Sequence, residues 1–407
     1  MNAGRLKVAV VSPRYGTQVG GGAETLAREY AVRLARHHEV TVLTTRALDY
    51  TTWADHYPAG ATVEDGVSVH RFSVPHPRDV KRFNRLSADV LSGRDVDDET
   101  AARWMREQGP NSPELLEHLS AFGATYDTVL FVPYLYATTV DGLPLVADRA
   151  VLVPAFHDEP PLRLPIFDAV VESAQAVVFS TPEERELALT RFVLDPERLH
   201  LVGAGIDPVA SSPDPSRAAR HPYVLCVGRV DPSKGSDTLI GFHSEYRRRR
   251  PAGFDLLMIG PHAVKLPRYP WLTAPGFVSE DEKRAAFEGA AALVCPSPYE
   301  SLSLVLLEAW AHGRPTMCTS ASPVLVGQTR RAGGGVWFSN AAEYAECLDL
   351  LTSSPALGHA LGRSGWHFTR TLLWPRVIER LEVALRQAAE GHRQLEAGLD
   401  RERVVEP

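Results

Sequence analysis

Short apolar runs alternate with amphipathic segments along most of the chain, and this pattern predicts an α/β fold. In the first half the apolar runs have the length of buried strands in a parallel sheet, and helical spacing of apolar residues separates them. The predicted strands are 6–11, 40–44, 67–72, 128–132, 150–153, 176–179 and 199–202. Helices are predicted at about 23–36 and 182–190, with a charged helical insertion at about 79–122.

The same alternation begins again after residues 204–221, a stretch rich in Pro, Ser, Ala and Asp that is typical of a linker. The second series of predicted strands is 223–227, 255–259, 290–295, 316–319 and 336–338. Helices are predicted at 236–248, 302–312 and 341–351, followed by a long amphipathic helix at about 374–399. Ser279 and Glu282 have the spacing of a capping box, and Asn340 is a predicted N-cap. The pattern therefore predicts two α/β domains that divide near residue 205.

Composition and charge narrow the class of protein. Of the 407 residues, 44% are hydrophobic and 23% are charged, as in an ordinary globular protein. The net charge of −7 offers no basic field for nucleic acid. The cysteines Cys226, Cys295, Cys318 and Cys347 are widely spaced, which favours free thiols in a reducing compartment and no metal site. No secretory signal or run of membrane-span length is visible, so we expect a cytoplasmic protein with at most peripheral contact at the cytoplasmic face of a membrane.

Two charged motifs have a simple explanation as solvated surface. Asp95 and Asp97 form an Asp-x-Asp that could hold a divalent cation, but they lie in an acidic patch without a preceding hydrophobic strand. The basic run 247–250 is expected in the last turn of a helix, where cations suit the helix dipole. Contact of this run with an anionic membrane surface is the alternative.

The loops that follow two strands of the first half carry candidate ligand contacts. Gly20, Gly21 and Gly22 are consecutive, so they lack the spacing of the dinucleotide fingerprint. Such a loop lets a phosphate or a sugar approach the backbone, and a merely flexible loop is the alternative. His157 follows the strand at 150–153 in a loop stiffened by prolines. It either faces a ligand or is a loop histidine held by Asp158.

The stretch 296–313 combines a strand end, a turn and a helix that is apolar nearly all round and expected to end with Gly313 at C′. Glu308 is the polar exception, and a carboxylate there is costly without a partner. It either contacts a ligand or pairs with a nearby arginine. Ligands of open α/β sheets bind at the carboxyl ends of the strands, and the amide groups at about 301–303 would suit an anion.

Arg229 and Lys234 follow the first strand of the second half and have the reach to flank a diphosphate. Glu308 could accept hydrogen bonds from two ribose hydroxyls, and Glu300 from hydroxyls of a sugar. Together these groups describe a nucleotide-sugar site. Fixed cations there would stabilise the departing nucleoside diphosphate without a metal.

These motifs resemble those of the GT-B glycosyltransferases of family 4. The resemblance covers essentially the whole chain, more closely in the second half. The residues that carry it are Gly21-Gly22-Ala23-Glu24, Val227-Gly228-Arg229 with Lys234-Gly235, and Glu300 and Glu308 followed by Ala311, Gly313 and Pro315. The resemblance implies two Rossmann-like domains that face an interdomain cleft. An acceptor-binding domain at 1–205, with 374–407 packing back on it as a crossing helix, would precede a donor-binding domain at 206–373.

The resemblance also implies roles by position. His157 and Glu300 would be catalytic, with Glu300 on the sugar, and Glu308 would bind the ribose. Arg229 and Lys234 would bind the diphosphate. The remaining donor contacts would come from the backbone of Gly21 and Gly22 and from Ser301, Leu302 and Ser303. The family usually has Gly-Phe-Gly after the first glutamate, so the serines here place a Cβ and a hydroxyl close to the sugar.

The predicted activity is metal-independent transfer of a sugar from a UDP- or GDP-sugar to a hydroxyl, with retention of anomeric configuration. No residue stands out as a covalent nucleophile, which favours front-face attack. The acceptor would be a glycan, a lipid-linked sugar or a small molecule, as in polysaccharide biosynthesis, bound by loops at 15–19, 49–61, 79–122 and 133–139. The alternatives are a nucleotide-sugar epimerase or a phosphorylase on the same frame, and an inactive donor-binding subunit. The sequence leaves the oligomeric state open.

Overall fold

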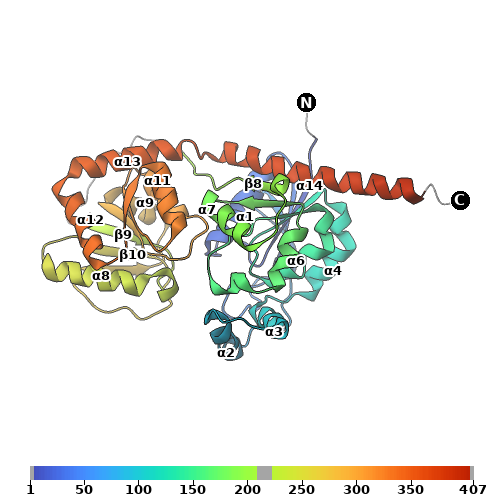
Figure 1. Cartoon of the computed structure of the whole chain (residues 1–407), viewed down its shortest axis with the longest axis horizontal. Helices are drawn as coiled ribbons and strands as arrows, with labels where there is room; N and C mark the ends of the chain where they lie inside the picture. Colours follow the sequence, from blue (N-terminus) through green and yellow to red (C-terminus); the bar gives the residue numbers. More distant parts are fainter. Residues whose placement is uncertain (1–3, 209–221, 404–407) are drawn as a thin grey trace. The chain divides into compact units, whose positions relative to one another are not determined.

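The structure is a computed structural model that describes residues 4–208 and 222–403, with side chains up to residue 393. Most of the predicted linker at 204–221 lies outside the described residues. The chain divides into two compact units (Figure 1): unit 1 comprises Met1–Gly203 and Val377–Pro407, and unit 2 comprises Ala204–Arg376.

Unit 1 is built on an eight-stranded sheet of order β3-β4-β2-β1-β5-β6-β7-β8. All neighbours are parallel except β3 and β4, which form an antiparallel hairpin at one edge. The strands are β1 (Lys7–Ser12), β2 (Glu39–Thr45), β3 (Gly60–Glu64), β4 (Val67–Phe72), β5 (Thr128–Phe131), β6 (Ala150–Leu152), β7 (Ala176–Phe179) and β8 (Leu199–Leu201). Strands β5, β6 and β7 are buried along their whole length because helices cover both faces of a parallel sheet.

The helices of unit 1 include the charged insertion predicted between β4 and β5. They are α1 (Gly22–Leu34), α2 (Val80–Leu91), α3 (Asp98–Gln108), α4 (Pro113–Phe122), α5 (Ala137–Val140), α6 (Ile166–Ser173), α7 (Pro182–Arg191) and α14 (Trp374–Arg403). From Val377 onward α14 belongs to unit 1. Its Arg380 donates to the carbonyl of Val202 at 3.2 and 2.8 Å, and its Leu381 and Leu385 are buried. The predicted return of the last helix to the N-terminal domain is confirmed.

Unit 2 is built on a six-stranded sheet of order β11-β10-β9-β12-β13-β14, parallel throughout. Its strands are β9 (Tyr223–Val227), β10 (Asp255–Ile259), β11 (Leu272–Gly276), β12 (Ala292–Cys295), β13 (Thr316–Thr319) and β14 (Gly335–Phe338). Its helices are α8 (Ser236–Arg249), α9 (Glu280–Gly289), α10 (Leu304–Ala311), α11 (Pro323–Ala332), α12 (Ala341–Ser353) and α13 (Pro355–Thr369). The capping box of Ser279 and Glu282 and the N-cap of Asn340 are confirmed.

The chain connects the two units through two segments, near residues 204 and 376, and these segments contact each other within unit 2. The Ile206 N–H donates to the Leu372 carbonyl at 2.9 Å, and Ile206 also forms a β-bridge with Leu373. Gly205 lies against Trp374, where an added Cβ would come within 2.3 Å of the indole ring. A side chain at 205 would therefore push these two segments apart.

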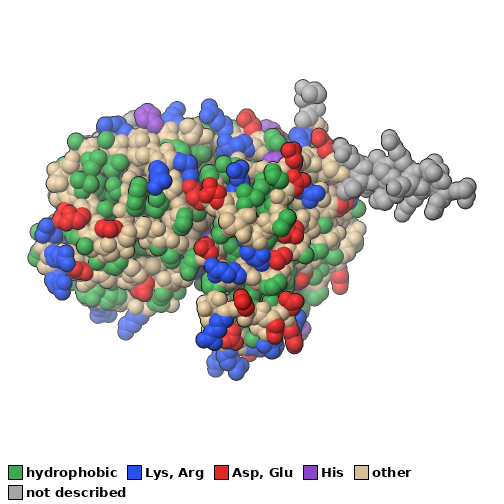
Figure 2. Space-filling model, viewed as in Figure 1, with side chains coloured by type: hydrophobic (Ala, Val, Ile, Leu, Met, Phe, Trp, Pro, Cys, Tyr) green, Lys and Arg blue, Asp and Glu red, His purple; other side chains and the backbone are tan. Residues whose placement is uncertain are grey.

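The two charged motifs are solvated surface, as predicted. Asp97 caps α3 by accepting from the Thr100 N–H at 2.7 Å, and Asp95 is exposed. The basic run ends α8, where Arg247 pairs with Asp255 at 3.0 Å and Arg250 with Asp349 at 2.9 Å. Figure 2 shows acidic side chains among the basic ones at this end of unit 2. Along the described part of the chain, no helix combines the length and the apolar character needed to cross a membrane.

Candidate functional site

The strand order of unit 2 reverses at β9, which has β10 on one side and β12 on the other. In open α/β sheets this switch point is where ligands bind, outside the carboxyl ends of the strands. The loops that follow β9 and β12 meet there. Gly235 has a φ of +74° and packs so closely on the Pro296 carbonyl that an added Cβ would lie 2.4 Å from its oxygen. Glycine is required at 235 for both reasons.

Lys234 and Glu300 face each other across these two loops. The Lys234 Nζ lies 2.8 Å from Glu300 Oε1, and the Tyr299 carbonyl oxygen is a second neighbour at 3.5 Å. The side chains are partly accessible, 35% for Lys234 and 15% for Glu300. Burial lowers the pKa of Lys234, but the charge and hydrogen bond of Glu300 raise it more, so the pKa lies above its ordinary value. The pair therefore presents a fixed ammonium and a fixed carboxylate at the switch point.

Arg229 belongs to the same loop, where Asp231 holds it. The Arg229 Nε donates to Asp231 Oδ2, and Asp231 also accepts from the Ser233 hydroxyl and from the Lys234 N–H at 3.2 Å. Burial raises the pKa of Asp231, but these contacts lower it more, and the net pKa is below its ordinary value. Asp231 is thus an ionised organiser of the loop, and sequence reasoning missed it although it stands between the two predicted cations.

Glu308 has an ion-pair partner, which is a lysine from another helix. Its Oε1 lies 3.2 Å from the Nζ of Lys283 on α9, and Lys283 also pairs with Glu280 at 3.0 Å. Burial raises the pKa of Glu308, and Lys283 offsets part of that rise. The partner differs from the arginine considered in the sequence, and no sequence pattern pointed to Lys283. The Glu308 side chain is 28% exposed, so it also has room for a ligand.

The segment from Ser301 to Ser303 requires a correction. Helix α10 begins at Leu304, two residues later than predicted, and the Ser303 N–H donates to Gln328 Oε1 at 3.1 Å. Gln328 in turn donates to the Ser303 carbonyl at 3.0 Å. The Ser303 amide is therefore committed to Gln328 and is not the anion-binding group expected there. Ser301 and Ser303 are buried and Leu302 is half-buried. Gly313, with a φ of +65°, ends the helix as predicted.

In unit 1 the glycine-rich loop is held in place. Arg14 and Glu24 form an ion pair in which each side chain is only 7% exposed. Arg14 also donates to the Gly20 carbonyl at 3.1 Å. Gly21 has a φ of +149°, and an added Cβ there would lie 2.1 Å from Glu24 Oε2. Gly20 and Gly22 have open space where a Cβ would be. The loop is thus a fixed backbone surface rather than a merely flexible connection.

The loop that contains His157 is held in place by the buried carboxylate of Glu184. Glu184 accepts from the Phe156 N–H at 2.8 Å and from the Ser180 N–H at 2.6 Å. The residue before Phe156, Ala155, has a φ of +55°, a conformation that L-residues rarely adopt. Glu184 therefore fixes the backbone next to His157, and sequence reasoning missed this role.

The partner of His157 is Glu159 rather than Asp158. His157 Nδ1 lies 3.4 Å from Glu159 Oε1, while Asp158 pairs with Arg163 at 3.0 Å. Glu159 also accepts from the hydroxyl of buried Tyr134 at 3.4 Å. The histidine is 28% exposed, which leaves its ring accessible to a ligand.

The cysteines and acidic residues form no metal centre in the described ranges. Cys226, Cys295, Cys318 and Cys347 are free thiols. Within residues 4–208 and 222–403, no group of His, Cys, Asp or Glu side chains has the arrangement of a metal site. The polar groups collected at the switch point of unit 2 are instead two cations and carboxylates, which suit a phosphate and hydroxyl groups.

Comparison with known sequences gives one family match in the second half of the chain and longer matches to individual relatives. Residues 221–353 match the family model described as glycosyl transferases group 1. The D-inositol 3-phosphate glycosyltransferase of Kribbella flavida is 26% identical over 57% of this chain and 61% of its own. The D-inositol 3-phosphate glycosyltransferase 2 of Catenulispora acidiphila is 28% identical over 60% and 67%. This chain spans about three fifths of the length of several such curated relatives.

Solved structures resemble the whole fold. The sucrose-phosphate synthase of Thermosynechococcus elongatus superimposes with a TM-score of 0.69 at 20% identity, covering 97% of this chain and 100% of the other. HepE of Anabaena in complex with UDP-glucose gives a TM-score of 0.65 at 13% identity, covering 95% and 99%. At these identities the comparison establishes the fold.

Proposed function

We propose that this chain, which has the GT-B glycosyltransferase fold and a group 1 glycosyl transferase domain, moves a sugar from a nucleoside diphosphate sugar to a hydroxyl acceptor. The observation that carries the proposal is the Lys234–Glu300 pair at the switch point of unit 2, with Arg229 beside it. A diphosphate needs fixed cations, and a sugar needs fixed acceptors for its hydroxyls. The matched relatives are named as glycosyltransferases, which supports the same function.

Lys234 and Arg229 are the proposed diphosphate contacts. An ammonium has three N–H donors, and the contacts of Lys234 with Glu300 and Tyr299 use at most two of them. A phosphate oxygen can take the third while Glu300 stays in place. Lys234 would therefore bind the diphosphate and orient Glu300 at the same time, and Glu300 would accept from hydroxyls of the sugar. Glu308, held by Lys283, is the proposed ribose contact, and the segment from Ser301 to Ser303 would lie against the donor.

The chemical step needs little from the protein beyond position and charge. The bond between the anomeric carbon and the β-phosphate oxygen breaks, and the two cations stabilise the charge left on the nucleoside diphosphate. The acceptor oxygen attacks from the same face, and its proton passes to the departing phosphate oxygen. This front-face path gives retention and requires no metal.

Unit 1 would supply the remaining groups. His157, oriented by Glu159, is proposed to contact the transferred sugar, and the open backbone at Gly21 and Gly22 to contact the donor. Acceptor-binding residues are proposed on unit 1, in the loops around β5 and the α2–α4 insertion. The donor would be a UDP- or GDP-sugar, and UDP-bound structural neighbours favour UDP.

Slow hydrolysis of a donor, in which water takes the place of the unknown acceptor, tests this proposal. The full chain is incubated with UDP-glucose or GDP-mannose, both α-linked, and the released sugar is followed by proton NMR. We expect the α-anomer to appear first, in EDTA as well, and Glu300→Gln to release sugar much more slowly. A new nucleotide sugar of altered configuration would favour an epimerase instead. No consumption of any donor despite tight nucleotide binding would favour an inactive subunit.

A further inference from the structure

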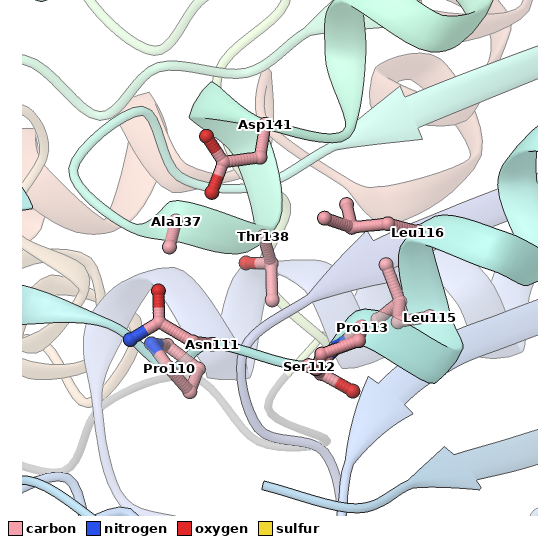
Figure 3. A pocket seen from close by; sticks show the side chains of 9 residues that line it. All are labelled: Pro110, Asn111, Ser112, Pro113, Leu115, Leu116, Ala137, Thr138 and Asp141. Carbon is pink, nitrogen blue, oxygen red and sulfur yellow. The ribbon is translucent and has the colours of Figure 1, made fainter. Parts of the chain in front are cut away.

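A small cavity in unit 1 is lined by polar groups that the proposed donor site does not use (Figure 3). Its volume is about 70 Å³, and it lies between the α3–α4 connection and the first turn of α5. The polar residues that line it are Asn111, Ser112, Thr138 and Asp141. The Ala137 N–H donates to the Gly109 carbonyl at 3.0 Å, which ties its two walls together.

Two buried hydroxyls of this cavity have no partner in the protein. Ser112 is 4% exposed and Thr138 is 2% exposed, and neither Ser112 Oγ nor Thr138 Oγ1 makes a hydrogen bond. Ser112 stands at the N-cap of α4, where a serine hydroxyl normally accepts from the helix backbone, but it makes no such bond. A buried hydroxyl without a partner is costly. By contrast, the neighbouring Thr139 hydroxyl donates to the Pro133 carbonyl at 2.6 Å.

Three of the polar side chains that line the cavity turn toward one space, whereas the Ser112 hydroxyl points away from it. Figure 3 shows the Asp141 carboxylate, the Thr138 hydroxyl and the Asn111 carboxamide facing one another across the cavity. Asn111 donates through Nδ2 to the Arg106 carbonyl at 2.6 Å, so its carbonyl oxygen stays available as an acceptor. Burial raises the pKa of Asp141. The groups thus offer acceptors and a hydroxyl donor in a cavity whose apolar lining includes Leu116.

We propose that this cavity holds the hydroxymethyl or diol end of a neutral, hydroxyl-rich acceptor, an inference that rests on the proposed transferase function. Its lining includes no Lys or Arg, and Asp141 would repel a phosphate or a carboxylate. Its volume has room for several water-sized groups but not for a nucleotide. Hydroxyl groups of a sugar can donate to Asp141 and to the Asn111 carbonyl oxygen and exchange hydrogen bonds with Thr138, while carbon atoms of the ring lie on the apolar wall.

The position of the cavity along the chain agrees with this role. It is lined by the segment that follows the carboxyl end of β5, the strand beside β1 at the reversal of strand order in unit 1. The same segment carries Tyr134, whose hydroxyl donates to Glu159, the partner of His157. The segment after β5 therefore both lines the cavity and contacts the loop that carries the proposed catalytic histidine.

Saturation-transfer NMR on the full chain tests this inference with methyl α-D-glucopyranoside and myo-inositol as neutral probes. Thr138→Val keeps the shape and removes only an unpartnered hydroxyl, so its melting temperature should equal or exceed that of the wild type. We expect the signal of at least one neutral probe to fall about fivefold or more in Thr138→Val. Thr190→Val, at an exposed site on α7, is the matched control and should keep the signal.

Glucosamine and glucose 6-phosphate serve as charged probes. Neutral signals that are equal in the wild type and Thr138→Val overturn the proposal, and so does binding of the charged probes alone. Asp141→Asn should retain the neutral probe, whereas an ammonium site would lose its ligand. Calorimetric titration of UDP or GDP on the same samples separates the two proposals. Intact nucleotide binding without probe binding contradicts only the cavity inference.

Discussion

The Nζ of Lys234 lies 2.8 Å from Oε1 of Glu300, although the two residues come from different loops of unit 2. The contact joins the loop after β9 to the loop after β12, the two neighbouring strands at which the strand order reverses. A cation and a carboxylate meet here because the sheet topology brings these two strand ends together. One residue suits a phosphate and the other a sugar hydroxyl, so under the proposed function the two parts of the donor would join beside this pair.

Removal of the Lys234 charge should weaken nucleotide binding. We expect Lys234→Met to raise the dissociation constant of UDP or GDP, whichever binds, by about 10- to 100-fold, the cost of a lost charge-assisted hydrogen bond. Glu300, left without its partner, would also repel the diphosphate. Isothermal titration calorimetry measures the change. Lys265→Met, at an exposed lysine of the same unit, is the control, and an equally small effect of both variants would contradict the assignment.

Glu300→Gln should separate turnover from binding. The amide keeps the shape but is a weaker acceptor for sugar hydroxyls, so we expect turnover of the donor to fall about 100-fold. The dissociation constant of the free nucleoside diphosphate should change less than about threefold, because Lys234 keeps its charge. Donor turnover by NMR and calorimetry on the same protein give both values. A large loss of nucleotide affinity with unchanged turnover would refute the sugar contact.

Glu308 should distinguish a ribose from a deoxyribose. The wild type is expected to bind the nucleoside diphosphate about tenfold more tightly than its 2′-deoxy form, and Glu308→Gln should bring this ratio close to one. Glu280→Gln is a matched control, because Glu280 pairs with the same Lys283 at 3.0 Å. Competition titrations give the ratios. If Glu308→Gln keeps the wild-type ratio, the carboxylate serves only the ion pair with Lys283.

Glu184 should give unit 1 a distinctive pH dependence. Burial raises its pKa from 4.5 to about 7, and the N–H groups of Ser180 and Phe156 offset part of that rise. A carboxyl pKa raised by folding stabilises the fold fully below the unfolded pKa, and this contribution is lost as pH rises through the folded pKa. Between pH 4.5 and pH 7 the wild type should therefore lose about 3 kcal/mol of unfolding free energy relative to Glu184→Gln.

Denaturant unfolding of both proteins across that pH range checks the Glu184 prediction. Glu186→Gln, on the exposed face of the same helix, should follow the wild-type curve. Parallel curves for the wild type and Glu184→Gln would show that Glu184 has no raised pKa in the folded protein.

Alanine substitutions at the neighbouring glycines Gly21 and Gly22 should have different effects on the stability of unit 1. Gly21→Ala places a Cβ against Glu24 at a positive φ, and we expect a loss of about 1–3 kcal/mol in the stability of unit 1. Gly22→Ala, with open space at the first position of α1, should be neutral or slightly stabilising. Differential scanning calorimetry of both variants gives the comparison. Equal melting temperatures would mean that the loop around Gly21 is not held as the structure describes.

The sequence predicted most strands, and it placed Arg229, Lys234 and Glu300 correctly in loops after strands, because buried parallel strands and glycine-rich turns have strong local signals. It missed strand β3, which is largely exposed, although Asp65 and Gly66 form a two-residue turn with positive φ values at both positions. It also missed α13, whose sequence contains Gly358, Gly362 and Gly365, since glycine disfavours helices.

The glycines of α13 have a tertiary cause that no local pattern reveals. An added Cβ at Gly362 would lie 2.0 Å from the Gly313 carbonyl oxygen, and one at Gly365 would lie 2.3 Å from the Trp310 ring. These glycines let α13 approach α10 closely. The partners of the site residues were hidden for the same reason. Lys283 reaches Glu308 from α9, and Gln328 reaches Ser303 from α11, through contacts between helices that only the fold creates.

Calorimetric titration of the full chain with UDP, GDP, ADP and TDP, with and without EDTA, is the direct test of the proposed donor site in unit 2. We expect one nucleoside diphosphate, UDP or GDP, to bind in the micromolar range with the same affinity in EDTA, and Lys234→Met to weaken this binding. Binding of that nucleotide would also identify the donor's base. Binding of ADP alone, or affinity that depends on a metal or ignores Lys234, would contradict the proposed donor site.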